Sequence, residues 1–161
     1  MSVAPKLYIE APREFDDSAP WLFPGPAVFL AGGITGCPDW QQEMRSLLCE
    51  SGLTLLNPRR ADFPIGDPDA ARAQIEWEHR HLRKADLILF WFCAATLNPI
   101  VLYELGAWSM RHKPLAVGIE PGYQREADVR IQTRLARPDV PIVASLQDLA
   151  EAVLKLAGGD Q

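Results

Sequence analysis

The chain has 161 residues, a net charge of −5, a hydrophobic fraction of 48% and a charged fraction of 23%. This length suits one domain with one sizeable core, and the composition is ordinary for a soluble globular protein. Because the chain is acidic and no run of five or more residues is basic, we do not expect it to bind nucleic acid.

No apolar stretch reaches the roughly 20 residues that a membrane helix needs. The acidic N-terminal segment lacks the basic and then apolar pattern of a signal peptide, so we expect a cytoplasmic protein without membrane contacts. The cysteines are Cys37, Cys49 and Cys93. Their odd number and irregular spacing argue against a disulfide framework or a structural zinc site, so all three are expected to be reduced.

Residues 1–26 contain five prolines and are predicted to form an irregular N-terminal arm. Its apolar patch, residues 7–9, could add an edge strand. Residues 27–161 are predicted to form a single domain.

Strand and helix patterns alternate through this domain. The predicted strands are 28–31, 53–56, 86–92, 115–119 and 141–144. The predicted helices are 38–50, 70–84, 100–112 and 146–156, the last capped by Ser145. Residues 120–139 are less regular and read as a long functional loop. This alternation predicts an α/β fold, a doubly wound, flavodoxin-like parallel sheet of five strands.

The first candidate site element is the turn after the first strand. Gly32, Gly33 and Gly36 would let backbone amides approach a ligand closely, and the next helix would offer its N-terminus to an anion or a sugar oxygen. The spacing is neither a dinucleotide fingerprint nor a P-loop, so a simple tight turn is an equally good interpretation.

The second candidate is Glu78. A wheel for residues 70–84 places it in the middle of the stripe that faces the core. That stripe is formed by Ala71, Ile75, Leu82 and Ala85. A carboxylate there should be paired or line a cleft. The same wheel predicts an exposed Trp77, covered by the arm or another subunit, and surface positions for His79 and His81.

The third candidate is Glu104, just past the carboxyl end of the most apolar strand, where open α/β sheets place their ligand crevice. It is expected in the first turn of a helix, where backbone amides and the helix dipole favour the ionised carboxylate. An ordinary acidic residue in a first turn is the alternative.

Several short motifs occur in an order and spacing that resemble the nucleoside 2-deoxyribosyltransferase-like family. The resemblance covers about residues 27–119. The motifs are Val28-Phe29-Leu30-Ala31-Gly32-Gly33-Ile34-Thr35-Gly36, Asn57-Pro58-Arg59-Arg60, Gln74-Ile75-Glu76-Trp77-Glu78, Ala85-Asp86, Asn98-Pro99-Ile100 and Glu104-Leu105-Gly106.

This resemblance implies an enzyme that cleaves or exchanges the N-glycosidic bond of a (deoxy)nucleoside or nucleotide. Glu104 would be the nucleophile and Glu78 would move a proton at the leaving base. The substrate-binding residues would be Gly32, Gly33, Asn98, Phe29, Thr35 and Trp40. The resemblance implies no metal or other cofactor, and it implies a homodimer or a larger homo-oligomer.

The sequence departs from the family pattern at four of these positions. Glu78 stands where Asp is usual, and Phe29 where Tyr is frequent. Asn98 replaces the Asp of the transferases or the Ser of the monophosphate glycosidases, and Thr35 replaces an Arg of some monophosphate glycosidases. The base, the sugar, the 5′ group and the choice between transfer and hydrolysis therefore stay open. A non-catalytic nucleotide-binding module and a plain flavodoxin-like scaffold are the alternatives. In the enzyme, the carboxylates of Glu78 and Glu104 should converge in one cleft.

Overall fold

The structure is a computed structural model that describes residues 7–15 and 23–159. Six parallel strands form one sheet in the order β1-β3-β2-β4-β5-β6. The strands are β1 (Tyr8–Glu10), β2 (Ala27–Gly32), β3 (Thr54–Asn57), β4 (Leu87–Phe92), β5 (Leu115–Ile119) and β6 (Ile142–Val143). Strands β2 to β6 have the predicted flavodoxin-like order, and β1 from the N-terminal arm adds a sixth strand at the edge, beside β3.

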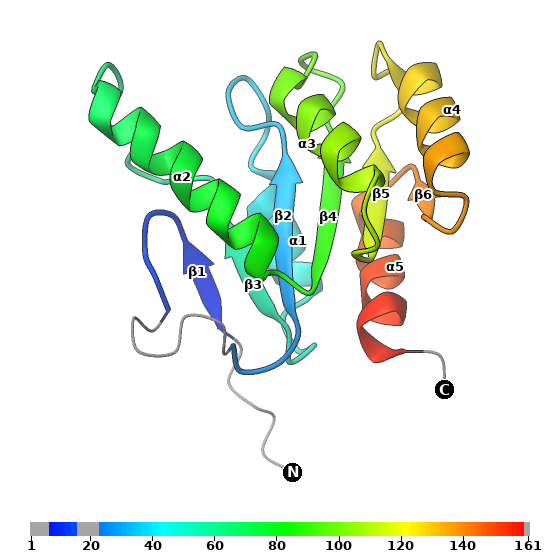
Figure 1. Ribbon diagram of the computed structural model, residues 1–161, viewed down its shortest axis with the longest axis horizontal. Helices are drawn as coiled ribbons and strands as arrows, with labels where there is room; N and C mark the ends of the chain where they lie inside the picture. Colours follow the sequence, from blue (N-terminus) through cyan, green and yellow to red (C-terminus); the bar gives the residue numbers. More distant parts are fainter. Residues whose placement is uncertain (1–6, 16–22, 160–161) are drawn as a thin grey trace.

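Helices cover both faces of the sheet (Figure 1). They are α1 (Trp40–Leu47), α2 (Pro68–Lys84), α3 (Pro99–Ser109), α4 (Glu126–Ala136) and α5 (Leu146–Gly158). Side chains that alternate along the central strands point to opposite faces. Phe29, Ile88 and Phe90 pack with residues of α2, α3 and α4, whereas Leu30 and Leu89 pack with residues of α1 and α5. Strand β4 is buried on both faces, as its continuous apolar run predicts.

The segment 120–139 is not the long loop that its irregular pattern predicted. It contains α4, whose Val129 and Thr133 are buried. Two ion pairs along the helix, Arg125 with Asp128 and Arg130 with Glu126, have the spacing of neighbouring helical turns. The predicted cap of α5 is confirmed, because the Ser145 hydroxyl accepts a hydrogen bond from the Asp148 amide at 3.1 Å.

The wheel for α2 is wrong about part of its buried face. Ile75 is 65% exposed, whereas Trp77 is 1% exposed. The Trp77 indole donates a hydrogen bond to the Arg13 carbonyl, so the N-terminal arm covers it. His81 is also buried, contrary to its predicted surface position. It stacks on Trp77 at 3.9 Å between ring centroids and faces the Glu14 carboxylate.

These contacts identify the stripe by which α2 packs onto the sheet. The residues of this stripe have helical spacing, but they include both polar and apolar side chains. A helical wheel that follows the apolar residues alone therefore predicts the wrong buried face. Its members are Gln74, Trp77, Glu78, His81, Leu82 and Ala85. Glu78 lies in the middle of this stripe too. Among the described residues, no helix is both long enough and apolar enough to span a membrane.

Candidate active site

A cavity of about 320 Å³ opens at the carboxyl ends of β2 and β4. The chain reverses its direction of travel across the sheet between these two strands, which is where open α/β sheets bind ligands. The lining comes from β2 and the turn after it, the loop after β3, the β4–α3 loop, and helices α2 and α3. It consists of Phe29, Ala31, Gly32, Gly33, Ile34, Thr35, Pro58, Glu78, Thr96, Asn98, Pro99, Ile100, Val101 and Glu104.

Two glycines in the turn after β2 cannot be replaced by larger residues without strain. A side chain at Gly33 would collide with the Asn98 amide oxygen, and Gly36 has φ +75°, which L side chains rarely adopt. Trp40 supports the turn from outside the cavity, because its indole donates a hydrogen bond to the Gly33 carbonyl at 3.0 Å. Trp40 is therefore not among the lining residues. Its contact with a ligand stays a prediction that the lining of the cavity does not support.

Asn98 forms the junction between the β4–α3 loop and α3. It is the N-cap residue of α3 in a left-handed conformation, with φ 53° and ψ 56°. Its Nδ2 donates to the carbonyls of Cys93 and Thr96, each at 2.9 Å. Its Oδ1 accepts from the Thr96 hydroxyl at 3.2 Å. The amide thus fixes the shape of this wall with its own hydrogen bonds.

A disulfide between Cys37 and Cys93 also joins the loops around the cavity. The expectation of three reduced cysteines is therefore wrong for this pair. The two residues are 56 positions apart but follow the ends of neighbouring strands, with 6.4 Å between their Cα atoms. Sequence spacing alone does not reveal that proximity. Cys49 is a free, exposed cysteine.

Glu78 is held in place by a neighbour on its own helix. Gln74 Nε2 donates to Glu78 Oε1 at 2.8 Å and to the Pro58 carbonyl at 2.7 Å. The opposite atom of this amide, Gln74 Oε1, is buried without a hydrogen-bond partner among the described residues. Burial raises the pKa of the Glu78 carboxyl, and the hydrogen bond from Gln74 opposes that rise.

Glu104 lies in the second turn of α3 instead of the predicted first turn, because the helix begins at Pro99. The expected benefit from the helix dipole is therefore small, since it falls off within the first turn. Burial raises the pKa of Glu104 to about 8, and the charge of Glu78 adds to the rise. No described residue donates a hydrogen bond to this carboxyl.

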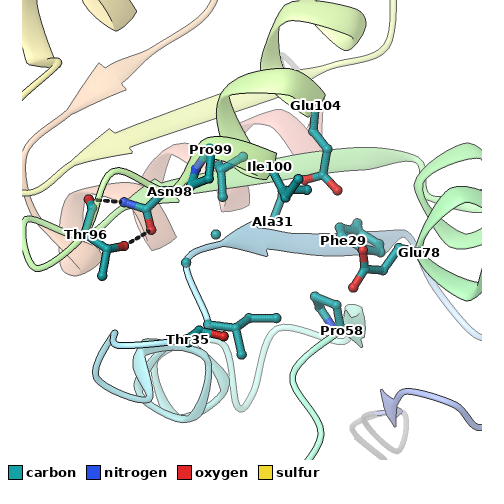
Figure 2. Close-up of a pocket in the computed structure, with 14 residues that line it drawn as sticks. Phe29, Ala31, Thr35, Pro58, Glu78, Thr96, Asn98, Pro99, Ile100 and Glu104 are labelled. Atoms are coloured by element: carbon teal, nitrogen blue, oxygen red, sulfur yellow. Dashed lines mark hydrogen bonds between the residues drawn. The ribbon is translucent and has the colours of Figure 1, made fainter. Parts of the chain in front are cut away.

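Figure 2 shows Glu78 and Glu104 beside Phe29 at one end of the cavity, with Asn98 and Thr96 at the other. Two carboxyls that interact titrate as a pair. The Glu104 pKa of about 8 lets this pair retain one proton near neutral pH. One group can then act as a nucleophile or base and the other as an acid. In the part of the chain that the structure describes, no group of three or more His, Cys, Asp or Glu residues could hold a metal ion.

Of the eight predicted catalytic and substrate-binding residues, seven line the cavity and Trp40 does not. Sequence reasoning missed Gln74 and Thr96 as contributors. The signal for Gln74 was available, because a Gln four residues before a helical Glu can hydrogen-bond to it. Thr96 contributes through its hydrogen bond to Asn98, and no local sequence pattern predicts that contact.

Comparison with known proteins agrees with this architecture. A family model described as "Nucleoside 2-deoxyribosyltransferase like" matches residues 25–123. The chain therefore belongs to the nucleoside 2-deoxyribosyltransferase-like family, which indicates an enzyme with that type of activity.

A crystal structure of a conserved protein from Enterococcus faecalis V583 has a similar fold, with a TM-score of 0.59 and 15% sequence identity. The similarity covers 80% of this chain and 97% of that one. No curated protein matches the chain.

Proposed function

We propose that this protein cleaves or exchanges the N-glycosidic bond of a (deoxy)nucleoside or nucleotide through a glycosyl-enzyme intermediate on Glu104. The observation that carries the proposal is the convergence of Glu78 and Glu104 in one cavity at the switch point of the sheet. A scaffold without a site would have no reason to bury two interacting carboxyls, because each costs free energy there.

In the first step, a carboxylate oxygen of Glu104 attacks the anomeric carbon of the sugar. The bond from that carbon to the base nitrogen breaks, its electron pair leaves with the base, and Glu78 supplies a proton to the base. A glycosyl ester on Glu104 results. In the second step, Glu78 accepts a proton from water or from a second base, which attacks the same carbon and releases Glu104. Two displacements at one carbon retain its configuration.

This scheme needs one proton in the carboxyl pair, located on Glu78 when Glu104 attacks. The raised pKa of both groups supports a shared proton near neutral pH. Gln74 Nε2 contacts Glu78 Oε1 alone, which leaves Glu78 Oε2 as the oxygen that can carry the proton. Water as the acceptor would make the protein a hydrolase, and a free base would make it a transferase.

The second candidate function is a binding module that has the same cavity but does not turn over its ligand. Two observations favour it: Phe29 offers no hydroxyl to Glu104, and a pKa of about 8 leaves much of Glu104 protonated at neutral pH in the free protein. The enzyme should convert its substrate to products, whereas the binding module should bind the ligand and release it unchanged.

The test is a panel of deoxynucleosides, ribonucleosides and their monophosphates, each incubated with and without a free acceptor base. Chromatography should detect released base, or a new nucleoside when an acceptor is present. Glu104→Gln is the matched variant, because it keeps the shape of the side chain and removes the nucleophile. Failure of the wild-type protein to convert any substrate would contradict the enzyme and favour the binding module.

A further inference from the structure

The Cys37–Cys93 disulfide joins two loops that form one end of the cavity, opposite the two acids. Cys37 lies in the segment between β2 and α1, which contributes Gly33 to the lining. Cys93 begins the β4–α3 loop, which contributes Thr96 and Asn98, and Figure 2 shows both of them at this end. The bond therefore ties together two walls of the candidate active site.

The strands that precede these loops do not need the bond. Strands β2 and β4 pair in a continuous parallel register that ends at Gly32 beside Trp91. Beyond that last pair, no backbone hydrogen bond joins the described residues 33–37 to residues 93–98. A covalent tie at this point therefore acts on the loops more than on the sheet.

The side chains that connect the two loops meet at the Cys37 sulfur. It lies 3.4 Å from Asn98 Oδ1 and 3.6 Å from the Thr96 hydroxyl. In the part of the chain that the structure describes, no other side-chain hydrogen bond crosses between these loops. Gly33 packs so closely here that an added Cβ would collide with both the Cys37 sulfur and Asn98 Oδ1. A movement of this sulfur must therefore displace the wall formed by Gly33 and Asn98, because close packing leaves no free space.

The hydrogen bonding of Asn98 also depends on the state of the two sulfurs. Bonded sulfurs carry no hydrogen, so Asn98 Oδ1 accepts from the Thr96 hydroxyl. The sulfurs of Cys37 and Cys93 lie 3.4 and 3.6 Å from the same oxygen, so each free thiol would add a weak donor within reach. Asn98 is the N-cap residue of α3 in a left-handed conformation. Competition for its amide oxygen would loosen the junction between the loop and the helix.

We propose that the Cys37–Cys93 bond is a site of thiol–disulfide exchange that controls this end of the cavity. While the bond is intact, it holds the two walls in the arrangement that receives the substrate. When a dithiol reduces it, the loops loosen and substrate binding weakens, because ordering the walls then costs free energy in the binding step. The effect on turnover rests on the proposed function, whereas the change in the loops does not.

The exchange balances with the dithiol as the one co-reactant. A thiolate of the dithiol attacks the Cys37 sulfur, which is 7% exposed against 1% for Cys93, and the Cys93 sulfur leaves with the electron pair of the bond. The second thiol of the reductant then attacks the mixed disulfide and releases Cys37. The dithiol is oxidised to its own disulfide, and its two protons end on the two cysteines.

The first test uses hydrogen exchange and needs no substrate. The Cys49→Ser variant, which lacks the exposed free cysteine, would be compared with and without dithiothreitol. Alkylation followed by peptide-mass spectrometry reports the state of the pair. We expect the amides of residues 33–37 and 93–98 to exchange at least about tenfold faster after reduction, while β2 and β4 stay protected.

The second test measures kinetics with the best substrate from the panel of nucleosides and nucleotides. Reduction of Cys49→Ser should raise KM by about tenfold and change kcat by less than about threefold, because the two acids lie at the opposite end of the cavity. The matched control carries Cys37→Ser and Cys93→Ser in the same Cys49→Ser background. It should behave as the reduced protein and show no response to dithiothreitol.

Each outcome decides the inference. A pair that dithiothreitol does not reduce in the folded protein would overturn it, and so would reduction that leaves exchange in both loops unchanged or unfolds the whole domain. Faster loop exchange with an unchanged KM, or a control variant that still responds to dithiothreitol, would also overturn it. If no substrate is converted, faster exchange confined to the two loops supports the inference while the proposed function fails. If the control variant does not fold, the reduced Cys49→Ser protein carries the test.

Discussion

The two acids of the cavity come from walls that support them differently. On the α2 wall, Glu78 is held by Gln74, which is itself anchored to the Pro58 carbonyl. On the α3 wall, Glu104 receives no hydrogen bond from any described residue, and its pKa is raised to about 8. One carboxyl is thus oriented by the protein, whereas the other is buried and unsupported. That difference matches a proton carrier with a fixed direction and a nucleophile whose lone pairs are free to attack.

The largest effect is expected from Glu104→Gln. If Glu104 is the nucleophile, kcat should fall by at least about 10³-fold for every substrate, since the amide that replaces its carboxylate cannot form the ester. The measurement is base release followed by chromatography. A loss below tenfold would assign the attack to another group.

Glu78→Gln should be less damaging and more selective. We expect kcat to fall by about 10²- to 10⁴-fold with an ordinary base as the leaving group, because protonation of that base is lost. A substrate whose leaving group needs no proton should lose far less. An equal loss for both kinds of substrate would show that Glu78 does not serve the leaving group.

The raised pKa of Glu104 predicts a pH-dependent difference in stability. The folded protein binds this proton more tightly than the unfolded chain, whose pKa lies near 4.5. The resulting stability is fully present below that value and is lost as the pH rises through about 8.

Urea unfolding at pH 5 and pH 9 measures this difference, with Glu104→Gln as the non-titrating reference. Relative to that variant, the wild type should lose on the order of 3 kcal/mol between the two pH values. Parallel stability curves would show that Glu104 is not held in a neutral form.

The smallest effect is expected from Gln74→Met, which keeps the length of the side chain and removes the donor to Glu78. The pKa of Glu78 should rise because the hydrogen bond lowers it. The alkaline limb of the rate profile should therefore move to higher pH, with a loss in kcat of about tenfold and little change in KM. Gln147→Met, at another Gln that hydrogen-bonds a Glu four residues later, is the control. An unmoved pH profile would make Gln74 a structural residue only.

Sequence patterns predicted the core of the fold and the acids of the site. The apolar run of β4 and the short strands around it are local signals, and they place Glu104 beside the carboxyl edge of the sheet. Glu78 lines the cavity, as the wheel predicted, but the buried stripe on which that prediction rested was partly wrong. The real stripe of α2 includes Gln74 and His81, and the burial of Trp77 depends on the N-terminal arm, which a helical wheel does not contain.

Other features depend on contacts between distant parts of the chain. The disulfide joins residues that only the sheet brings together, and the conformation of Asn98 depends on carbonyls of the β4–α3 loop. The ionisation of Glu104 depends on how deeply it is buried and on its distance from Glu78. Neither quantity can be predicted from the local sequence. A sequence pattern can therefore name the reacting groups but not their protonation.

The most direct test of the account is to trap the intermediate. The wild-type protein would be incubated with a nucleoside that carries fluorine at C2 of the sugar, which slows breakdown of the ester, and then examined by intact-mass and peptide-mass spectrometry. We expect a mass increase of one glycosyl group on the peptide that contains Glu104, and no such increase in Glu104→Gln. Turnover of the natural nucleoside with the adduct on another residue, or with inversion at the anomeric carbon, would contradict it.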